Sequence, residues 1–185
     1  MLIKHENEKL INAIIYFLQN TNQCGKTKLM KLLYLLDFEH FSQIGKSVTG
    51  LDYYAWEFGP VPEKLWRDLT DKKSKISNII VCFQEVSSKF QKLKARKDFD
   101  SKYFSDREFK LLKNIAYIYK DARADDMVKL SHLPFAPWDM TIKAKGEKQK
   151  IDYMLALESF KSSLPKEEVE ERIADRHFIQ TFFNG

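Results

Sequence analysis

Apolar residues recur at helical spacing over the first 45 residues. A stripe at i, i+3/i+4 and i+7 predicts an amphipathic helix over residues 6–20. A second run, from about Thr27 to Gln43, is apolar on nearly every face, so we expect a central and buried helix. Gly45 is suited to end it, because glycine readily adopts the left-handed conformation of a helix C-terminus. The first stripe consists of Leu10, Ile11, Ile14, Ile15 and Leu18.

The pattern changes to strands after Gly50. Residues 51–58 alternate and are aromatic, which predicts a strand. Gly59-Pro60-Val61-Pro62 is expected to end it, since proline has no N–H to donate to a sheet, and a short helix is expected over 63–70. Strands are also predicted near 78–86 and 89–97, as a hairpin with a turn at Ser87-Ser88.

The remainder of the chain is predicted to be helical. Ser105 and Glu108 match the S-x-x-E capping box ahead of an apolar run, and a short helix is expected over 124–130. A proline-bearing loop is expected over 131–138, then a helix over 151–160. The fold class predicted is α+β and predominantly helical, with helices packed around a small antiparallel sheet. Residues 1–162 form one domain, followed by a charged helix and apolar tail over 163–185.

Composition supports a folded protein with a real core. Of the 185 residues, 44% are hydrophobic and 14% aromatic. No apolar run reaches the ~18 residues that a membrane span requires, and the N-terminus lacks the apolar region of an export signal. The two cysteines, Cys24 and Cys82, have no C-x-x-C spacing. A cytoplasmic protein with reduced thiols, not bound to membranes, is therefore expected.

The net charge of +5 is concentrated in one segment. Between Asp71 and Lys102 there are nine cationic and four anionic side chains, which accounts for the whole surplus. In the second hairpin strand, Lys92, Lys94 and Arg96 alternate with apolar residues, so they are expected on one solvated face. Such a face is compatible with three interpretations: a solvated surface, a docking surface for an acidic protein, or a contact with nucleic-acid phosphates.

No combination of residues predicts an enzyme. Gly25-Lys26-Thr27 resembles the end of a phosphate-binding loop but lacks its first glycine and preceding strand, which favours a plain helix start. Asp37 and His40 can face each other on one helix, as a hydrogen-bonded pair or, less favourably, as part of a hydrolase site. Asp125-Asp126 suits the first turn of a helix. We therefore predict no catalytic residues, no cofactor and no metal site.

Aromatic and apolar residues offer two candidate contact surfaces. Tyr53 and Trp56, in the predicted strand before the proline corner, have the residue types that anchor protein interfaces, although such residues are more often core. Near the C-terminus, Phe178, Ile179, Phe182 and Phe183 either fold back on the core or form a contact site.

An ordered set of motifs resembles one family, the Panacea domain of SocA-like, phage-associated antitoxins. The first motif is Lys28–Phe41, KLMKLLYLLDFEHF. The second is the turn and strand from Ser47-Val48-Thr49-Gly50 to Tyr54-Ala55-Trp56, followed by Phe58-Gly59-Pro60-Val61-Pro62. The third is Leu130-Ser131-His132 followed by Pro137-Trp138. Together these motifs span most of residues ~10–160.

This resemblance implies the antitoxin of a type II toxin–antitoxin system, which neutralises a cognate toxin by direct protein–protein binding. We expect contacts through Tyr53, Trp56, Lys92, Lys94 and Arg96. A proteolytic adaptor is a second role that the resemblance implies. A nucleic-acid-binding regulator or phage accessory protein, using the basic hairpin, is the alternative from the charge pattern, and a homo-oligomer stays open.

Overall fold

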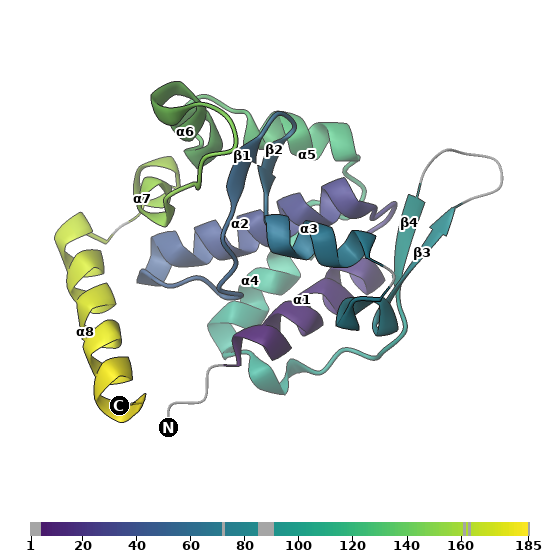
Figure 1. Cartoon of the computed structure of the whole chain (residues 1–185), viewed down its shortest axis with the longest axis horizontal. Helices are drawn as coiled ribbons and strands as arrows, with labels where there is room; N and C mark the ends of the chain where they lie inside the picture. Colours follow the sequence, from purple (N-terminus) through teal and green to yellow (C-terminus); the bar gives the residue numbers. More distant parts are fainter. Residues whose placement is uncertain (1–4, 72, 85–90, 161, 163, 185) are drawn as a thin grey trace.

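The computed structural model describes residues 5–71, 73–84, 91–160, 162 and 164–184. The chain is predominantly helical, with two small antiparallel hairpins, as Figure 1 shows. This confirms the predicted fold class. In chain order the helices and strands are α1 Glu6–Asn20, α2 Lys26–Ile44, β1 Tyr54–Trp56, β2 Gly59–Val61, α3 Glu63–Thr70, β3 Ile80–Gln84, β4 Gln91–Ala95, α4 Asp106–Ile118, α5 Ala124–Ser131, α6 Pro137–Lys145, α7 Ala156–Ser159 and α8 Lys166–Asn184.

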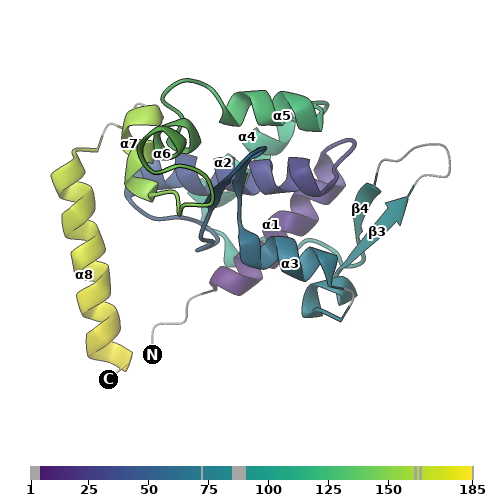
Figure 2. The same cartoon turned by 45° about the horizontal axis from the view of Figure 1, so that its top comes forward.

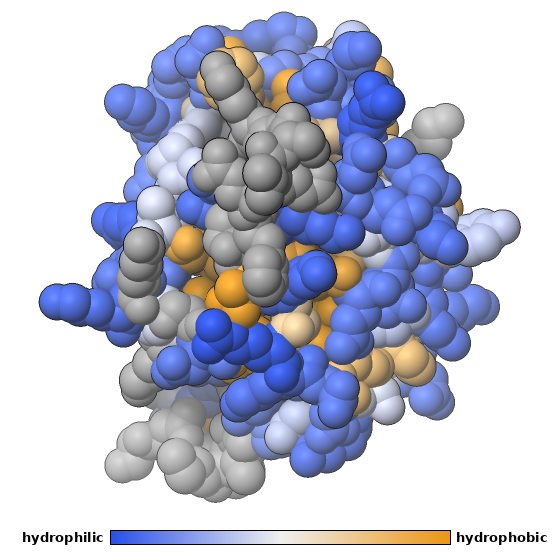
Figure 3. Space-filling model, turned by 90° about the vertical axis from the view of Figure 1, so that its right-hand side faces the viewer, coloured by the Kyte–Doolittle hydropathy of each residue, from blue (hydrophilic) through white to orange (hydrophobic). Residues whose placement is uncertain are grey.

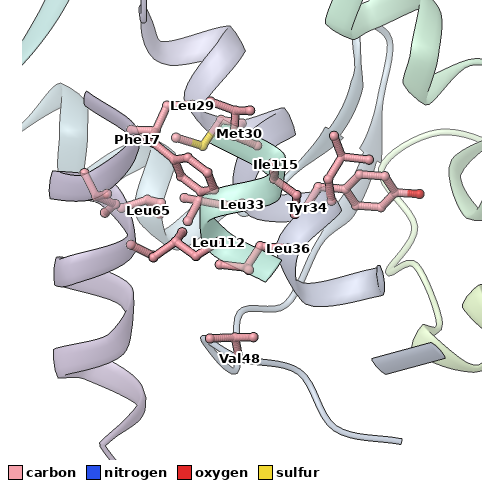
Figure 4. Packing of buried hydrophobic residues seen from close by; sticks show 14 of the residues in the cluster. Phe17, Leu29, Met30, Leu33, Tyr34, Leu36, Val48, Leu65, Leu112 and Ile115 are labelled. Carbon is pink, nitrogen blue, oxygen red and sulfur yellow. The ribbon is translucent and has the colours of Figure 1, made fainter. Parts of the chain in front are cut away.

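Helix α2 is the centre of the fold, as predicted from its apolar sequence. It contacts α1, α3, α4, α5, α7 and β2, so it lies inside a shell of other elements (Figures 1 and 2). Leu29, Leu33 and Leu36 are fully buried, and Figure 4 shows them packed among side chains from α1, α3 and α4. Gly45 ends the helix with φ 68°, the left-handed conformation expected of it.

The predicted single sheet is wrong: the strands form two separate hairpins. β1 pairs with β2, which contains the Gly-Pro-Val segment that was expected to end the strand. Pro60 is tolerated because it lies opposite Ala55, whose N–H and C=O point away from β2. The Ala55 N–H donates to Gln149 O (2.9 Å), and the Lys148 N–H donates to Ala55 O (2.8 Å). No ladder bond therefore needs the N–H that proline lacks.

The second hairpin agrees with its prediction. β3 and β4 pair from Ile80↔Ala95 to Gln84↔Gln91, and the turn predicted at Ser87-Ser88 lies outside the described residues. Leu93 is 1% exposed, and its N–H donates to Cys24 O (2.9 Å). β4 is thereby attached to the loop between α1 and α2.

The C-terminal part differs from the sequence prediction in the placing of its helices. The helix predicted over 151–160 is reduced to a 3-10 turn at Tyr153–Leu155 and the short α7. The Ser105–Glu108 capping box starts α4 as predicted, with the Ser105 N–H donating to Glu108 Oε2 (2.8 Å). Helix α6 begins at Pro137, inside the region expected to be a loop, because proline suits the first position of a helix. Helix α8 continues to Asn184 and includes the predicted apolar tail. It lies at one side of the molecule (Figure 2).

The attachment of α8 depends on a few residues near its beginning. Val169 is fully buried and lies against the backbone of Gly45, where an added Cβ would be 2.9 Å from a Val169 methyl carbon. The Arg172 guanidinium donates to Ile44 O (3.5 Å), and Arg176 donates to Gly45 O. Phe178 and Phe182 are 70% and 73% exposed, so the apolar tail does not fold back on the core.

Candidate functional site

The turn between β1 and β2 presents a cluster of aromatic side chains, which we call the aromatic corner: Trp56, Phe58, Trp66 and Trp138. Trp56 and Trp66 meet edge to face, with ring centroids 5.9 Å apart, and Trp56 Nε1 donates to Glu63 Oε1 (3.0 Å). Phe58 is 65% exposed at the tip of the turn. The corner thus contains two tryptophan rings fixed by contacts within the protein and one phenylalanine ring, Phe58, that projects into solvent.

Helices α5 and α6 brace the corner from behind. Trp138 Nε1 donates to the backbone oxygen of Trp56 (2.8 Å). The Trp138 ring stacks on His132, with centroids 3.8 Å apart and planes 6° from parallel. Burial lowers the pKa of His132, so the neutral imidazole that stacks on the indole is favoured. Two of the sequence motifs, around residues 56 and 132–138, are therefore parts of one structural unit.

A buried lysine lies beneath the turn. Lys31, on α2, is 2% exposed, and its ammonium donates to Pro60 O (3.0 Å). Burial lowers the pKa of Lys31 to about 7, because the charged form loses its hydration. Gly59 crosses directly above with φ 97°, and a Cβ there would lie 2.5 Å from Ser131 Oγ and 2.8 Å from Lys31 Nζ. Glycine is needed at this position by both its conformation and its surroundings.

A cavity of about 600 Å³ opens at the aromatic corner. This volume lies within the range of about 300–1,000 Å³ that is usual for ligand sites. Its walls are mainly apolar and come from α2, the β1–β2 hairpin, α3 and α5: Met30, Trp56, Phe58, Val61, Trp66 and Val128. Such a cavity can accommodate a side chain of another protein.

Tyr53 does not belong to this surface, contrary to the sequence prediction. It is 0% exposed, and its hydroxyl donates to Asp37 Oδ2 (2.8 Å). In the β1 segment Tyr53 faces the core, whereas Trp56 lies at the turn, where the chain leaves the core. Tyr53 is therefore a core residue, and its hydroxyl ties the chain just before β1 to α2.

The predicted Asp37–His40 pair is also wrong. Asp37 is fully buried and accepts hydrogen bonds from Val48 N–H (2.8 Å), Thr49 N–H (2.7 Å) and the hydroxyls of Thr49 and Tyr53. Burial raises the pKa of Asp37 to about 6, although these hydrogen bonds oppose the shift. His40 Nδ1 instead bonds Lys46 O (2.6 Å). Asp37 anchors the loop before β1, which is a structural role.

The basic residues of β4 lie apart from the aromatic corner. Lys94 and Arg96 are exposed and Lys92 is half-buried, so the solvated face predicted for this strand is present. This strand and the β1–β2 turn occupy different parts of the molecule (Figures 1 and 2). Figure 3 views the side of the β3–β4 hairpin, where the surface is mostly hydrophilic with an apolar area near its centre. The five predicted contact residues therefore do not form one patch.

The other motifs have structural roles. Gly25 precedes α2 as its N-cap residue, so Gly25-Lys26-Thr27 is a helix start. Asp126 Oδ2 accepts a hydrogen bond from the Arg123 N–H (3.0 Å) in the first turn of α5, as its sequence position indicated. Among the described residues, no group of three His, Cys, Asp or Glu side chains is placed to hold a metal ion. No helix in that part of the chain is long and apolar enough to cross a membrane.

Comparison with protein families decides the assignment. The family described as antitoxin SocA-like, Panacea domain, matches residues 29–139, which is more than half of the chain. The chain belongs to this family. The match runs from α2 to the start of α6 and contains the aromatic corner and both hairpins, whereas α8 lies outside it. No curated protein and no solved structure matches the chain.

Two residues at or beneath the corner carry no predicted contact role in this Panacea-domain sequence. Phe58 belongs to the predicted strand and the family motif, and Lys31 belongs to the KLMKLLYLLDFEHF motif. Lys28 and Lys31 both interrupt the apolar run of α2 and both are buried, so a lysine within an apolar run is the available signal for a buried amine. Its placement under Gly59 depends on packing between α2 and the β1–β2 turn, which a local pattern does not encode.

Proposed function

We propose that this chain is the antitoxin of a type II system and neutralises a cognate toxin protein by direct binding at the aromatic corner. The observation that carries the proposal is the corner itself, within the family match. It combines an exposed phenylalanine, two held tryptophans and a cavity of about 600 Å³. Aromatic anchors beside a desolvated pocket are typical of the residues that dominate protein-interface energetics.

The binding mode needs no chemistry from the antitoxin. Complex formation alone masks or distorts the toxin, and slow dissociation makes the inhibition last. The exposed cationic residues Lys94 and Arg96 support a separate contribution, which is faster encounter with a partner that has an acidic region facing them. The two surfaces can have different roles: the aromatic corner binds the partner, and the charge of β4 raises the rate of encounter.

The first experiment expresses the product of the adjacent reading frame with and without this chain. We expect growth arrest by that product alone, rescue by co-expression, and co-purification of the two proteins. A lethal neighbour that this chain neither rescues nor binds would contradict the proposal.

The second experiment compares two phenylalanines of similar exposure. Phe58 is 65% exposed at the corner, and Phe178 is 70% exposed on α8, outside the family match. We expect Phe58→Ala to weaken toxin binding by about 2 kcal/mol or more, roughly 30-fold, because it removes an interface anchor. Phe178→Ala should leave Kd within about twofold. A larger loss of affinity in Phe178→Ala than in Phe58→Ala would place the binding surface on α8 instead.

Nucleic-acid binding through β4 is tested with the variant Lys92→Gln, Lys94→Gln, Arg96→Gln. Phosphate contacts make log K fall linearly with log[salt], so duplex DNA binding that is steeply salt-dependent and lost in this variant would support a regulator. Toxin binding that survives 0.5 M salt and depends on Phe58 would support the antitoxin role instead.

A further inference from the structure

The mouth of the corner cavity carries more carboxylates than cations. Glu57, Asp125 and Glu147 line it and are exposed, whereas Lys148 is the exposed cation among its lining residues. None of the three carboxylates forms an ion pair with another described residue. The chain as a whole has a charge of +5. An acidic mouth on a basic protein is therefore a local property of this site.

The carboxylates come from three different segments. Glu57 lies in the turn between β1 and β2, Asp125 in the first turn of α5, and Glu147 in the segment after α6. Their side chains reach one opening only because Trp138 Nε1 binds the Trp56 backbone oxygen and the backbone of 148–149 pairs with Ala55. The tertiary structure thus places an acidic ring around apolar walls.

The buried Lys31 does not oppose a cationic ligand at the mouth. Its ammonium lies below Gly59 at the floor of the cavity, where it binds Pro60 O. Burial lowers its pKa to about 7, so it can lose its charge at little cost near neutral pH. The Lys26 ammonium already lies over the Trp66 ring, 5.9 Å from its centroid, so a cationic ligand would pair with the carboxylates and not with this indole face.

Charge and shape together indicate the chemistry of the occupant. We propose that the cavity binds a basic segment of the toxin, which inserts a large apolar side chain between Trp56, Trp66 and Val128 and pairs flanking Lys or Arg side chains with Glu57, Asp125 and Glu147. This inference rests on the proposed function, because it names the chemistry of the partner at the same site. An apolar anchor gains from burial against the indoles, and each flanking pair is favoured by the acidic mouth.

Capped hexapeptides test this chemistry on the full chain. The probe is Lys-Arg-Leu-Phe-Arg-Lys, with Glu-Asp-Leu-Phe-Asp-Glu and Lys-Arg-Ser-Ser-Arg-Lys as comparisons. The three tryptophans of the chain all belong to the corner, so their fluorescence reports occupancy there, and calorimetry gives Kd. We expect the probe to bind at least tenfold more tightly than either comparison, since one lacks the cations and the other lacks the anchor.

Charge-reversed variants locate the site. Glu57→Lys with Glu147→Lys should weaken probe binding at least tenfold and strengthen binding of the acidic peptide. Glu167→Lys with Glu171→Lys on α8 makes the same change in net charge at exposed positions elsewhere and should leave Kd within twofold. Absence of probe binding, equal binding of all three peptides, or equal effects of the two double variants would overturn the inference.

The two proposals can fail separately. If the toxin binds and depends on Phe58 but the peptides show no preference, direct binding at the corner stands and the partner chemistry is wrong. If the probe binds at the corner with the expected preference but the adjacent protein is neither neutralised nor bound, the site chemistry stands and the antitoxin role fails.

Discussion

Replacing Lys31 with methionine should stabilise the protein, and by an amount that depends on pH. Methionine fills a similar volume without an amine, so the desolvation cost of the buried ammonium disappears. The pKa of Lys31 is lowered from 10.5 to about 7. Each pH unit of such a difference corresponds to about 1.4 kcal/mol, so the charged form costs about 5 kcal/mol at pH 6, where folded and unfolded chains are both protonated.

This cost shrinks as the pH rises. Above pH 7 the folded chain has lost the proton while the unfolded chain keeps it up to about pH 10.5, so the unfolded state binds more protons and stability rises with pH. Between pH 7 and 9 the wild-type protein should gain about 2 kcal/mol relative to Lys31→Met. The variant also loses the hydrogen bond to Pro60 O, which costs about 1–3 kcal/mol at every pH.

The two contributions give a definite pattern. Lys31→Met should be more stable than wild type by about 2–4 kcal/mol at pH 6 and within about 1 kcal/mol of it at pH 9. Urea denaturation followed by far-UV circular dichroism at both pH values measures the two free energies of unfolding. Subtracting the free energy of unfolding of wild type from that of the variant cancels the contributions of groups that titrate equally in both proteins. His132 is an exception, because burial and the Lys31 charge both lower its pKa in the wild type, and the variant lacks that charge. A difference that does not change between pH 6 and 9 would refute the argument.

Three further predictions concern residues that stabilise the fold. Gly59→Ala should destabilise more than Gly146→Ala by about 1–3 kcal/mol in urea denaturation: both have positive φ, but only the first Cβ meets other atoms; equal losses would contradict the steric argument. Asp37→Ala leaves two N–H groups and two hydroxyls without their acceptor and should cost at least about 3 kcal/mol, whereas Asp37→Asn, which keeps an acceptor oxygen, should cost less. Val169→Asp buries an unpaired charge, so limited proteolysis should cut α8 about tenfold faster while helices α1 to α6 stay protected. Unchanged α8 cleavage would show that this contact does not attach it.

The helices and their limits could be predicted well from sequence because their signals are local. The predicted ranges of α1 and α3 match the structure, those of α2 and α5 differ by one residue at one or both ends, and the predicted start of α4 is correct. The helix predicted over 151–160 is an exception, because only Ala156–Ser159 form an α-helix there. Periodic apolar residues, a capping box and Gly45 each act within a few residues of chain. Helix α6 was missed because prolines 134 and 137 suggested a loop, although Pro137 is the first residue of a helix.

The candidate site could be predicted only in part. Trp56 was expected at a contact surface and lies at the corner, but Tyr53, just before the same strand, is buried against Asp37. Alternation within a strand separates its two faces but does not say which face meets the core. Here the answer depends on the pairing of Ala55 with residues 148–149, nearly 100 positions away.

The sequence by itself determined the helix pattern, the fold class and the motifs that mark the Panacea family, since these depend on neighbouring residues and their order. The tertiary structure decided what lies at the corner. It divided the strands into two hairpins, placed the Lys31 ammonium beneath Gly59, and brought Glu57, Asp125 and Glu147 around one opening. These side chains meet because α2, the β1–β2 turn, α5 and the segment after α6 pack together, and that packing is set by long-range burial and hydrogen bonding.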